Sequence, residues 1–408
     1  MRGAVVAVGS ELLLGDVVNS NAATLGTELA AAGVDVVSSV AVPDVIGEVV
    51  DAIRAGLDRA DVVVVCGGLG PTVDDLTRDA VAVACEAPLV RHTDLEQHLR
   101  VLLSTYLKDV PAEVYRQADV PTGAEALPNP AGTAPGLWLE KDGKVVVALP
   151  GPPRELRAVS PPVWERLAAR SGRRLTTRTV LVAGVGESLV AERVQARLVL
   201  PAGVALSYLA GGALVRVRFT SADAALLDPL VALVGEVMRD HVVGYDGDTL
   251  DAVVHRALAA RGETVAVAES LTGGLLAAAL TDRSGASETF RGGLVVYATD
   301  LKELLAGVPG PLLDAQGAVS EETAAALAAG ARDRLGADWG LATTGVAGPT
   351  EQEGHPVGTV FVAVAGPAGG EVRRLQLPGE RAQVRAVSVT YALDLLRRHL
   401  SDGKTAGS

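Results

Sequence analysis

Ser270 lies at a predicted junction between a strand and a helix, in the stretch Ala-Glu-Ser-Leu-Thr-Gly-Gly at residues 268–274. A serine in this position is close to the positive end of the helix dipole. Backbone N–H groups near Thr272 and Gly273 could form an oxyanion hole for acyl transfer. Serine is also a common helix N-cap. This stretch alone therefore does not decide whether Ser270 is a nucleophile or a structural helix cap.

A base for Ser270 is available in the stretch Tyr-Ala-Thr-Asp-Leu-Lys at residues 297–302. A serine hydroxyl is a weak nucleophile at neutral pH and needs a base. We expect Tyr297 to end a strand and Lys302 to open the next helix, so that both face the edge that carries Ser270. A lysine that is desolvated or placed beside a tyrosine can act as that base. The alternatives are a solvated helix lysine and a tyrosine at the rim of the site.

A further loop and two arginines could bind the substrate. The loop at residues 343–349 follows a buried strand and can present N–H groups, including that of Gly345, and the Thr344 hydroxyl. Arg381 and Arg385 are four residues apart, so they share one face of the last predicted helix. They could clamp a phosphate, although exposed arginines are the plainer interpretation.

The stretch Cys-Gly-Gly-Leu-Gly-Pro-Thr-Val-Asp-Asp at residues 66–75 indicates a second site. Glycines at the end of a strand let backbone N–H groups approach an anion, and the following helix adds its positive end. Asp74 and Asp75 could hold a divalent cation beside phosphates. A tight turn with Asp75 as a helix cap is the alternative. The substrate-binding candidates in this stretch are Gly67, Gly68, Gly70 and Thr72.

Three other loops of the first 170 residues are also candidates for this ligand edge. They cover residues 9–21, which include Asn21 as a substrate-binding candidate, residues 129–136 and residues 150–155. Ligands of open α/β sheets bind at the carboxyl ends of the strands. Each loop alone indicates only a turn, since glycine and proline are common in turns.

These residues must be positioned by alternating strands and helices. Residues 1–170 contain strand-like runs at 4–8, 34–42, 61–66 and 145–149, with helical patterns at 22–32, 46–59 and 76–86 between them. Such alternation predicts a parallel sheet covered by helices on both faces. We expect residues 137–149 to add a hairpin that turns at 141–144. The predicted fold class is therefore α/β.

The rest of the chain divides into a small module and a second α/β domain. Residues 171–246 predict an α+β unit with strands at 175–182, 204–209 and 214–220 and helices from 186 and at 224–240. Residues 247–400 predict a helix at 251–260, strands at 264–268, 293–297, 340–343, 357–364 and 372–377, and helices from 271, at 321–334 and at 381–399. We expect residues 401–408 to be a disordered tail.

Composition excludes several classes of protein. A net charge of −13 over 408 residues argues against general nucleic-acid binding. Cys66 and Cys85 are the only cysteines, too few for a disulfide framework or a cysteine-based zinc site. No signal peptide is evident at the start, and no apolar stretch approaches the ~18 residues of a membrane span. We therefore expect a cytoplasmic enzyme.

The first 170 residues resemble the N-terminal domain of the CinA (competence/damage-inducible protein A) family, which is similar to molybdopterin-binding domains. The matching stretches lie at residues 9–15, 67–75, 129–136 and 150–155, with Ser10 and Pro43 where the family usually has aspartate and glycine. The resemblance implies a metal-dependent ADP-ribose pyrophosphatase. It also implies a divalent ion (Mg, Mn or Co) bound by Asp44, Asp74, Asp75 and Glu155.

Residues 250–400 resemble the C-terminal domain of the same family, the PncC-type nicotinamide-nucleotide amidohydrolase. The matches lie at 268–274, 290–293, 317–322, 344–349, 356–359 and 379–381, together with Tyr297, Lys302 and Arg385. The resemblance implies deamidation of nicotinamide mononucleotide (NMN), without a cofactor, by Ser270, Tyr297 and Lys302. The residue after the serine is usually cysteine and is Leu271 here, which leaves the Ser270 hydroxyl as the nucleophile.

Residues 171–246 resemble the KH-like module of full-length CinA proteins, at residues 185–189 and 214–219. Their Gly-Val-Gly at 184–186 is followed by glutamate and lacks the basic loop with which KH domains clamp RNA. We therefore expect a spacer or dimerisation role in a homodimer, without direct nucleic-acid binding. A scaffold for DNA uptake or recombination with degenerate sites, and a molybdopterin-binding or transferase role, are the alternative functions.

Overall fold

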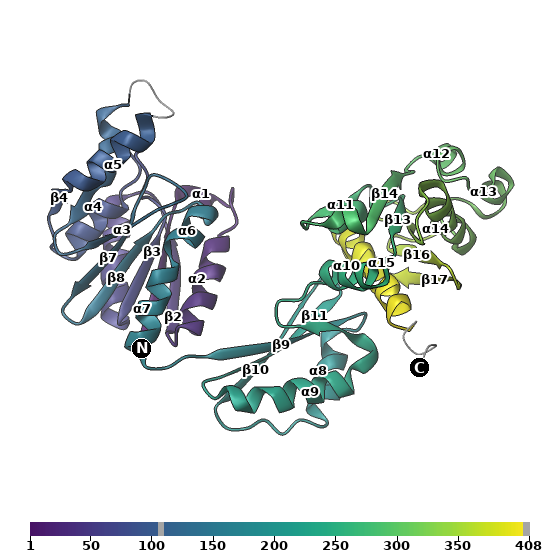
Figure 1. The fold of residues 1–408 in the computed structure, drawn as a ribbon, viewed down its shortest axis with the longest axis horizontal. Coiled ribbons are helices and arrows are strands. Elements are labelled where there is room, and N and C mark those ends of the chain that lie inside the picture. The colour runs from purple at the N-terminus through teal and green to yellow at the C-terminus, as the bar shows by residue number, and fades with distance from the viewer. Residues whose placement is uncertain (105–109, 403–408) are drawn as a thin grey trace. The chain divides into compact units, whose positions relative to one another are not determined.

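A computed structural model describes residues 1–104 and 110–402 of the chain. The chain divides into two compact units, Met1–Thr176 and Thr177–Ser408 (Figure 1). The sheets of both units mix parallel and antiparallel strands with helices between them, which confirms the α/β fold class. No helix among the described residues is long and apolar enough to cross a membrane.

The first unit is built on a six-stranded sheet in the order β2-β1-β3-β8-β7-β6, with β1, β2, β3 and β8 parallel. The predicted hairpin is confirmed, since β7 pairs antiparallel with β8 and turns between Lys141 and Lys144. The strands of the unit are β1 (Arg2–Val8), β2 (Asp35–Val42), β3 (Val62–Cys66), β4 (Leu89–Arg91), β5 (Asp119–Pro121), β6 (Glu125–Leu127), β7 (Gly136–Lys141) and β8 (Lys144–Leu149).

Valine-rich strands form the centre of this sheet, and helices cover both of its faces. One core contains side chains of α3 and α4, and the other contains side chains of α2, α6 and α7. β3 is buried along its whole length because it lies between these two layers. The helices are α1 (Ser10–Leu14), α2 (Ser20–Ala31), α3 (Ile46–Arg59), α4 (Thr77–Ala84), α5 (Thr93–Ser104), the 3-10 helix η1 (Ala112–Ala118), α6 (Pro153–Val159) and α7 (Pro161–Ser171).

The second unit begins with the α+β module, whose four-stranded sheet has the order β10-β11-β9-β12. Side chains of α8 and α9 pack on this sheet. The edge strand β12 was not predicted. The elements are β9 (Thr176–Ala183), α8 (Glu187–Gln195), β10 (Val204–Gly211), β11 (Leu214–Ser221), η2 (Ala224–Leu226), α9 (Leu227–Val237), η3 (Arg239–His241) and β12 (Val242–Tyr245).

A five-stranded sheet in the order β14-β13-β15-β16-β17 forms the rest of the second unit. β13 pairs parallel with β14 and β15, whereas β16 and β17 are antiparallel. Helices α10, α11 and α15 pack on one face, and α13 and α14 on the other. The strands are β13 (Val265–Glu269), β14 (Phe290–Val295), β15 (Trp339–Gly345), β16 (Thr359–Gly366) and β17 (Gly369–Gln376).

The helices around this sheet differ from expectation at several places, and neither α13 nor the short η4 was predicted. The predicted helix from residue 271 begins only at Leu275, and α15 continues through Ser401 and Asp402, two residues of the predicted tail. Residues 403–408 lie outside the described residues. The helices are α10 (Leu250–Arg261), α11 (Leu275–Thr281), η4 (Ala286–Glu288), α12 (Thr299–Leu304), α13 (Gly310–Gln316), α14 (Glu321–Leu335) and α15 (Arg381–Asp402).

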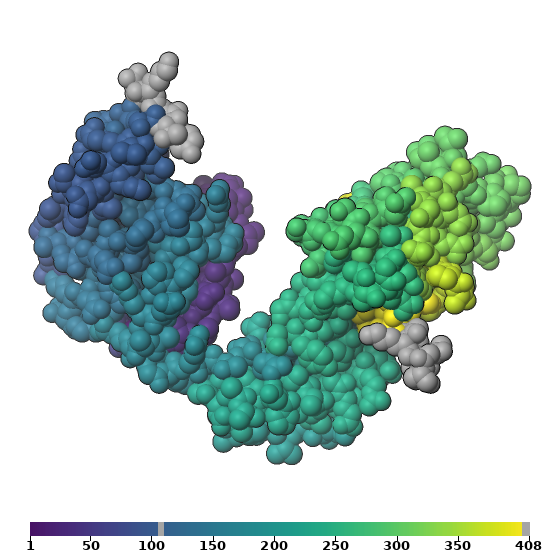
Figure 2. Space-filling model, viewed as in Figure 1, coloured from purple at the N-terminus to yellow at the C-terminus, as the bar shows by residue number. Residues whose placement is uncertain are grey.

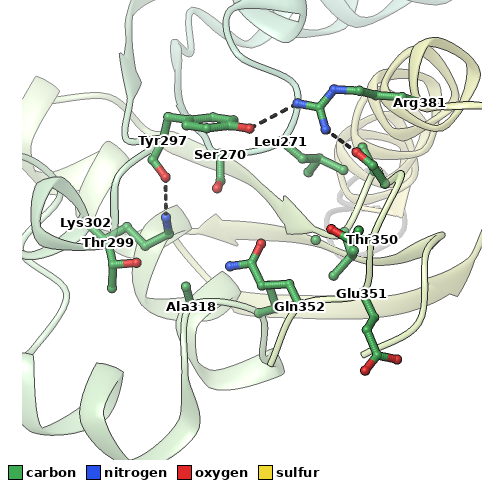
Figure 3. A pocket seen from close by; sticks show the side chains of 15 residues that line it. Ser270, Leu271, Tyr297, Thr299, Lys302, Ala318, Thr350, Glu351, Gln352 and Arg381 are labelled. Carbon is green, nitrogen blue, oxygen red and sulfur yellow. Dashed lines mark hydrogen bonds between the residues drawn. The ribbon is translucent and has the colours of Figure 1, made fainter. Parts of the chain in front are cut away.

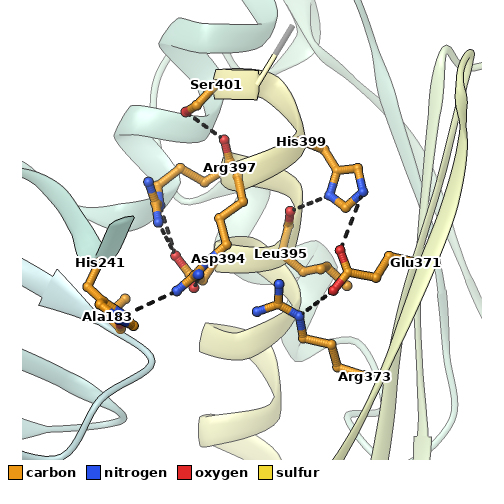
Figure 4. A network of polar contacts seen from close by, with 10 residues as sticks. Ala183, His241, Glu371, Arg373, Asp394, Leu395, Arg397, His399 and Ser401 are labelled. Atoms are coloured by element: carbon orange, nitrogen blue, oxygen red, sulfur yellow. Dashed lines mark hydrogen bonds and ion pairs between the residues drawn. The ribbon is translucent and has the colours of Figure 1, made fainter. Parts of the chain in front are cut away.

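The α+β module and the last domain share one core, which explains why they form a single unit. Leu181 and Val243 of the module belong to the same buried cluster as side chains of α10 and α15. One polar contact crosses this interface, since Arg398 Nη2 of α15 lies 3.4 Å from His241 Nδ1 of the module. Asp394 of the same helix accepts from Arg397 and Arg398, both at 2.8 Å (Figure 4). His241 lies 3.2 Å from the carbonyl of Ala183. Residues 177–402 accordingly form one continuous body in the space-filling view (Figure 2).

Candidate functional site

A pocket of about 370 Å³ at the carboxyl ends of β13 and β15 brings together residues that are far apart in sequence. Ser270, Tyr297, Lys302, Gly345 and Arg381 all line it (Figure 3). The three predicted catalytic side chains therefore meet at one place. Carboxyl ends of neighbouring strands are the usual position of ligand sites in α/β sheets.

Ser270 lies in a turn between β13 and α11 instead of at a helix start. Gly273 and Gly274 have φ values of 57° and 98°, which a right-handed helix does not allow. Gly273 N donates to Ser270 O at 3.2 Å, so this amide is already occupied. Because α11 begins only at Leu275, the expected position of Ser270 directly at the helix start is wrong, and the Gly273 N–H donates to a backbone carbonyl.

Glu269 explains why the turn has this shape. Its buried carboxylate accepts from the N–H groups of Gly274, Leu276 and Ala277 at 2.8–3.0 Å. Such bonds satisfy the free N–H groups at a helix start. Glu269 therefore caps α11 and holds the residue before Ser270 in place. The described hydrogen bonds of Lys302 go to the carbonyls of Val296 and Tyr297 instead of to Glu269.

Three predicted substrate-binding side chains support the site from outside the pocket. The Thr272 hydroxyl lies 2.7 Å from the Thr343 hydroxyl, and Thr344 Oγ1 donates to Ala318 O at 2.6 Å. Arg385 donates to the carbonyls of Leu271 and Thr272 at 2.9 and 2.8 Å. These side chains hold the turn and the loop that line the pocket. Neither they nor Gly273 line the pocket themselves.

Lys302 lies in the middle of α12 and does not open it, and Tyr297 follows the end of β14 at Val295, so both expected positions were wrong by two or three residues. The Lys302 amine is buried, with only 1% of the residue exposed. Its Nζ donates to the carbonyls of Val296 and Tyr297 at 2.9 and 3.3 Å (Figure 3). Burial lowers the pKa of Lys302, and the charges of Glu353 and Asp300 oppose that shift. A lowered pKa increases the fraction of neutral amine near neutral pH, which is the form that can accept a proton.

Tyr297 and Arg381 lie at the mouth of the pocket. Tyr297 is 60% exposed, and its hydroxyl accepts from Arg381 Nη2 at 3.0 Å. Arg381 Nη1 also donates to Gly348 O at 2.6 Å, which fixes the guanidinium plane against the loop after β15. The pocket thus has a cation at its entrance and a neutralisable amine at its base. Sequence analysis missed three lining residues after this loop, Thr350, Glu351 and Gln352.

Glu353 offers a test of the electrostatics around Lys302. Its carboxylate accepts from Val319 N at 2.9 Å, a bond that a glutamine oxygen can keep. Because the Glu353 charge raises the pKa of Lys302, Glu353→Gln will lower that pKa further. If Lys302 is the base, the rising limb of the pH–rate profile will move to lower pH in this variant. Glu351→Gln is the matched control, and an unmoved limb in Glu353→Gln would contradict the expected coupling.

The first unit carries a second pocket, of about 500 Å³, at the carboxyl ends of β1, β3 and β8. The predicted metal ligands all line it, and so do the three glycines of the predicted anion loop and Glu11. The expected residues that line it are Asp44, Gly67, Gly68, Gly70, Asp74, Asp75 and Glu155.

Asn21 and Thr72 lie beside this pocket without lining it. Asn21 Nδ2 donates to Gly151 O at 2.6 Å and to Cys66 Sγ at 3.3 Å, so it joins two of the loops. Thr72 donates to Asp75 Oδ2 from its amide at 2.8 Å and from its hydroxyl at 2.5 Å. Burial raises the pKa of the Cys66 thiol to about 12, so it stays protonated and is not a nucleophile at neutral pH.

The carboxylates of this pocket are partly occupied by hydrogen bonds. Asp44 Oδ2 accepts from Ser10 N and Oγ, both at 2.8 Å, and Glu155 accepts from Asn129 at 2.7 Å. No three acidic, histidine or cysteine side chains among residues 1–104 and 110–402 are grouped to hold an ion. Mg²⁺ usually takes one or two carboxylates together with substrate phosphates. One or two of these carboxylates beside the anion loop therefore fit such an ion, whereas the expected four ligands are not grouped around one point in the described residues.

Arg78 was not predicted, although it is the largest fully buried side chain of the chain that the structure describes. Its guanidinium donates to the carbonyls of Leu69 and Gly70, the latter at 2.8 Å. Burial, followed by the charge of Arg116, lowers its pKa to about 10, so it remains charged at pH 7. A cation thus lies directly beneath the loop and favours an anion above it. In the sequence, the one feature that could have pointed to Arg78 is a charged residue on the inner face of the predicted helix at 76–86.

Arg78→Met will loosen the glycine loop. It leaves two carbonyls without donors, and an unsatisfied buried group costs about 1–3 kcal/mol. We expect the free energy of local opening at residues 67–75 to fall by about that amount, measured by amide hydrogen exchange. The exposed Arg59, replaced in the same way, is the control. Unchanged exchange in Arg78→Met would show that the loop does not depend on this guanidinium.

An apolar recess of about 440 Å³ adjoins the second pocket, with Thr133 lining both. Leu95, His98, Leu99 and three prolines line the recess. A ligand in the carboxylate pocket therefore has an apolar surface next to it. Neither the recess nor α5, which forms one side of it, was predicted.

Comparison with known proteins yields two family matches. Residues 247–400 match the family described as "CinA C-terminal domain". Residues 4–168 match the family described as "Probable molybdopterin binding domain". The two matches flank the α+β module and include both pockets.

Similar full-length proteins cover nearly the whole chain. A "CinA-like protein" of Frankia casuarinae is 47% identical over 418 residues, which cover 98% of this chain and 96% of that protein. A "Putative competence-damage inducible protein" of Desulforudis audaxviator is 40% identical, with 98% and 99% coverage. The crystal structure of the protein CinA from Thermoplasma acidophilum is 35% identical with a TM-score of 0.38, and covers 41% of this chain and 97% of that chain.

Proposed function

Because the chain belongs to the CinA family, we propose that its C-terminal domain is a nicotinamide-nucleotide amidohydrolase. It converts NMN and water to nicotinic acid mononucleotide and ammonia. The observation that carries this proposal is the single pocket lined by Ser270, Tyr297, Lys302 and Arg381. A hydroxyl, a buried amine and an entrance cation are the groups that acyl transfer on an anionic amide requires.

The proposed reaction passes through an acyl-enzyme. The Ser270 oxygen attacks the carboxamide carbon while its proton passes to neutral Lys302, with Tyr297 as a relay. The protonated base then gives its proton to the departing ammonia, and a water molecule hydrolyses the ester. Burial of Lys302 supports this role because it favours the neutral amine.

Arg381 is the proposed contact for the phosphate of NMN. Its two terminal nitrogens are held by Tyr297 and Gly348, which pre-orients the guanidinium at the pocket mouth. A fixed guanidinium binds a phosphate group with less loss of side-chain entropy than a free one. Arg385 supports the serine turn and is not proposed as a second phosphate contact.

For the N-terminal domain we propose a metal-dependent ADP-ribose pyrophosphatase. The glycine loop above Arg78 holds the diphosphate, and one or two of the pocket carboxylates, among Asp44, Asp74, Asp75 and Glu155, are the candidate ligands of a divalent ion. Such an ion, when bound, would neutralise phosphate charge and polarise phosphorus toward water. Cleavage yields AMP and ribose 5-phosphate. The protein is proposed to act as a cytoplasmic homodimer in pyridine nucleotide salvage.

One substrate panel tests both activities. The purified full-length protein is incubated separately with NMN, with ADP-ribose plus Mg²⁺, Mn²⁺ or Co²⁺, and with molybdopterin. Ammonia release from NMN supports the amidohydrolase, and AMP release from ADP-ribose supports the pyrophosphatase. Binding of molybdopterin alone would favour a cofactor-binding role. If the protein releases neither ammonia nor AMP and does not bind molybdopterin, a scaffold with degenerate sites is favoured and both proposals are overturned.

A further inference from the structure

Gln117 is a buried amide without a partner on the wall of the N-terminal pocket. It is 0% exposed and lines the pocket together with the glycine loop. Neither Nε2 nor Oε1 has a hydrogen-bond partner in the part of the chain that the structure describes. Buried amides are almost always hydrogen-bonded, because an unpaired buried polar group is destabilising. Both atoms are closed to solvent in the unliganded pocket, so a group that binds there would supply the missing partners once the Gln117 side chain rotates toward it.

The backbone around Gln117 is firmly held, so the amide has a defined place. Arg116 pairs with Asp79 at 2.9 Å and reaches the carbonyl of Thr72 at 3.5 Å. On the other side, Ala118 O accepts from His92 N at 2.9 Å. These contacts fix the end of η1 against the loop that is expected to hold an anion. The position of Gln117 therefore follows from the fold.

The hydrogen-bonding groups of an amide limit which kinds of ligand can bind Gln117. Nε2 carries two N–H donors and Oε1 is only an acceptor. A phosphoryl oxygen above the glycine loop can accept from Nε2, but it has no hydrogen to give to Oε1. A hydroxyl group next to the phosphate can give one. Phosphate beside a hydroxyl is the arrangement found in a sugar phosphate and not in inorganic diphosphate.

We propose that Gln117 is a ligand-binding residue that selects sugar phosphates in this pocket. Its Nε2 donates to a phosphoryl oxygen, and its Oε1 accepts from a sugar hydroxyl. The inference rests on the proposed use of the pocket for a phosphorylated ligand, but it does not require that the ligand be cleaved. Gln117, which was not predicted as a site residue, thus distinguishes a nucleotide from inorganic diphosphate.

Gln117→Leu in the full-length protein tests the proposal. Calorimetry at pH 8 with Mg²⁺ compares ribose 5-phosphate, AMP and pyrophosphate as ligands. Loss of both hydrogen bonds will weaken ribose 5-phosphate and AMP by about 10- to 100-fold. Pyrophosphate, which loses only the bond from Nε2, will be weakened less. An equal loss for all three ligands, or no loss, would overturn the selection.

Thermal unfolding separates this role from a structural one. An unpartnered buried amide can be replaced by an apolar group of similar size without harm, so the midpoint will be unchanged or higher in Gln117→Leu. A clearly lower midpoint would show that the amide stabilises the fold and would overturn the inference. Glu113→Ala, an exposed change in the same short helix, is the control for both measurements.

Failure of the proposed pyrophosphatase would look different. Wild-type protein that binds ribose 5-phosphate without releasing AMP from ADP-ribose would defeat the proposed reaction and leave the role of Gln117 intact. Wild-type protein that binds none of the three ligands would overturn the role of Gln117 as well.

Discussion

Replacing Ser270 with alanine will reduce ammonia release from NMN by at least about 1,000-fold, the scale of loss when a catalytic nucleophile is removed. The proposed acyl-enzyme forms on the Ser270 oxygen, and the neighbouring Leu271 has no group that could replace it. The turn should persist, because Glu269 and Arg385 hold it through backbone atoms. Steady-state ammonia release, with circular dichroism to verify folding, measures the effect.

A trapped intermediate provides a second measurement. Acid quenching of the wild-type protein during turnover should preserve an ester whose mass corresponds to the nicotinate mononucleotide acyl group, and Ser270→Ala should lack it. Thr281→Ala, an exposed hydroxyl at the end of α11, is the control and should retain activity. Near-normal turnover by Ser270→Ala would refute the nucleophile, even if NMN proves to be the substrate.

The strands that carry both sites were largely predictable because their signal is local. The buried valine runs of β3 and β8 have both faces covered, and the predicted residues 61–66 and 145–149 agree with them within one residue. Short or half-exposed elements gave no such signal. β14 alternates between intermediate and exposed residues and begins at Phe290, three residues before its predicted start. Packing, and not propensity, decides such segments.

The serine site was predicted from the rule that the carboxyl ends of neighbouring strands lie close together. This rule has a limit. It correctly places Ser270, Tyr297 and Lys302 in one pocket, because β13, β14 and β15 are neighbours. It does not tell which way a side chain points. Thr344 lies near the end of the correct strand, β15, yet its hydroxyl donates to the carbonyl of Ala318. Arg385 shares a helix face with Arg381, yet it binds the carbonyls of the turn.

The sequence does not show which backbone groups a buried charged residue beneath a loop will bind. Glu269 and Arg78 both satisfy backbone groups of a binding loop, one through a carboxylate and the other through a guanidinium. Their partners are backbone N–H and C=O groups, which every residue has, so residue types carry no trace of the pairing. Gln117 is missed for a related reason, because only the fold shows that its amide is buried and unpaired.

Replacing Lys302 with methionine will lower kcat/KM for NMN by about 100- to 10,000-fold, the range that a general base contributes. Methionine fills the buried site without a proton acceptor of suitable basicity. Methionine also leaves the carbonyls of Val296 and Tyr297 without this donor, so the thermal midpoint should fall, and activity is compared well below that midpoint. Lys302→Arg keeps the positive charge but cannot be neutral near pH 7. It should therefore be as inactive as Lys302→Met if proton transfer, and not charge, is the role of this residue.

The pH dependence ties this loss to a proton on Lys302. Because burial lowers the pKa of Lys302, the neutral base is present at lower pH than for a free lysine. In the wild type, kcat/KM will rise with pH and level off above an apparent pKa below the ordinary lysine value. That limb will be absent from the residual activity of Lys302→Met. If the rise of kcat/KM with pH persists in Lys302→Met, or if Lys302→Arg is fully active, the base must be another group. The Tyr297 hydroxyl is then the next candidate in the pocket.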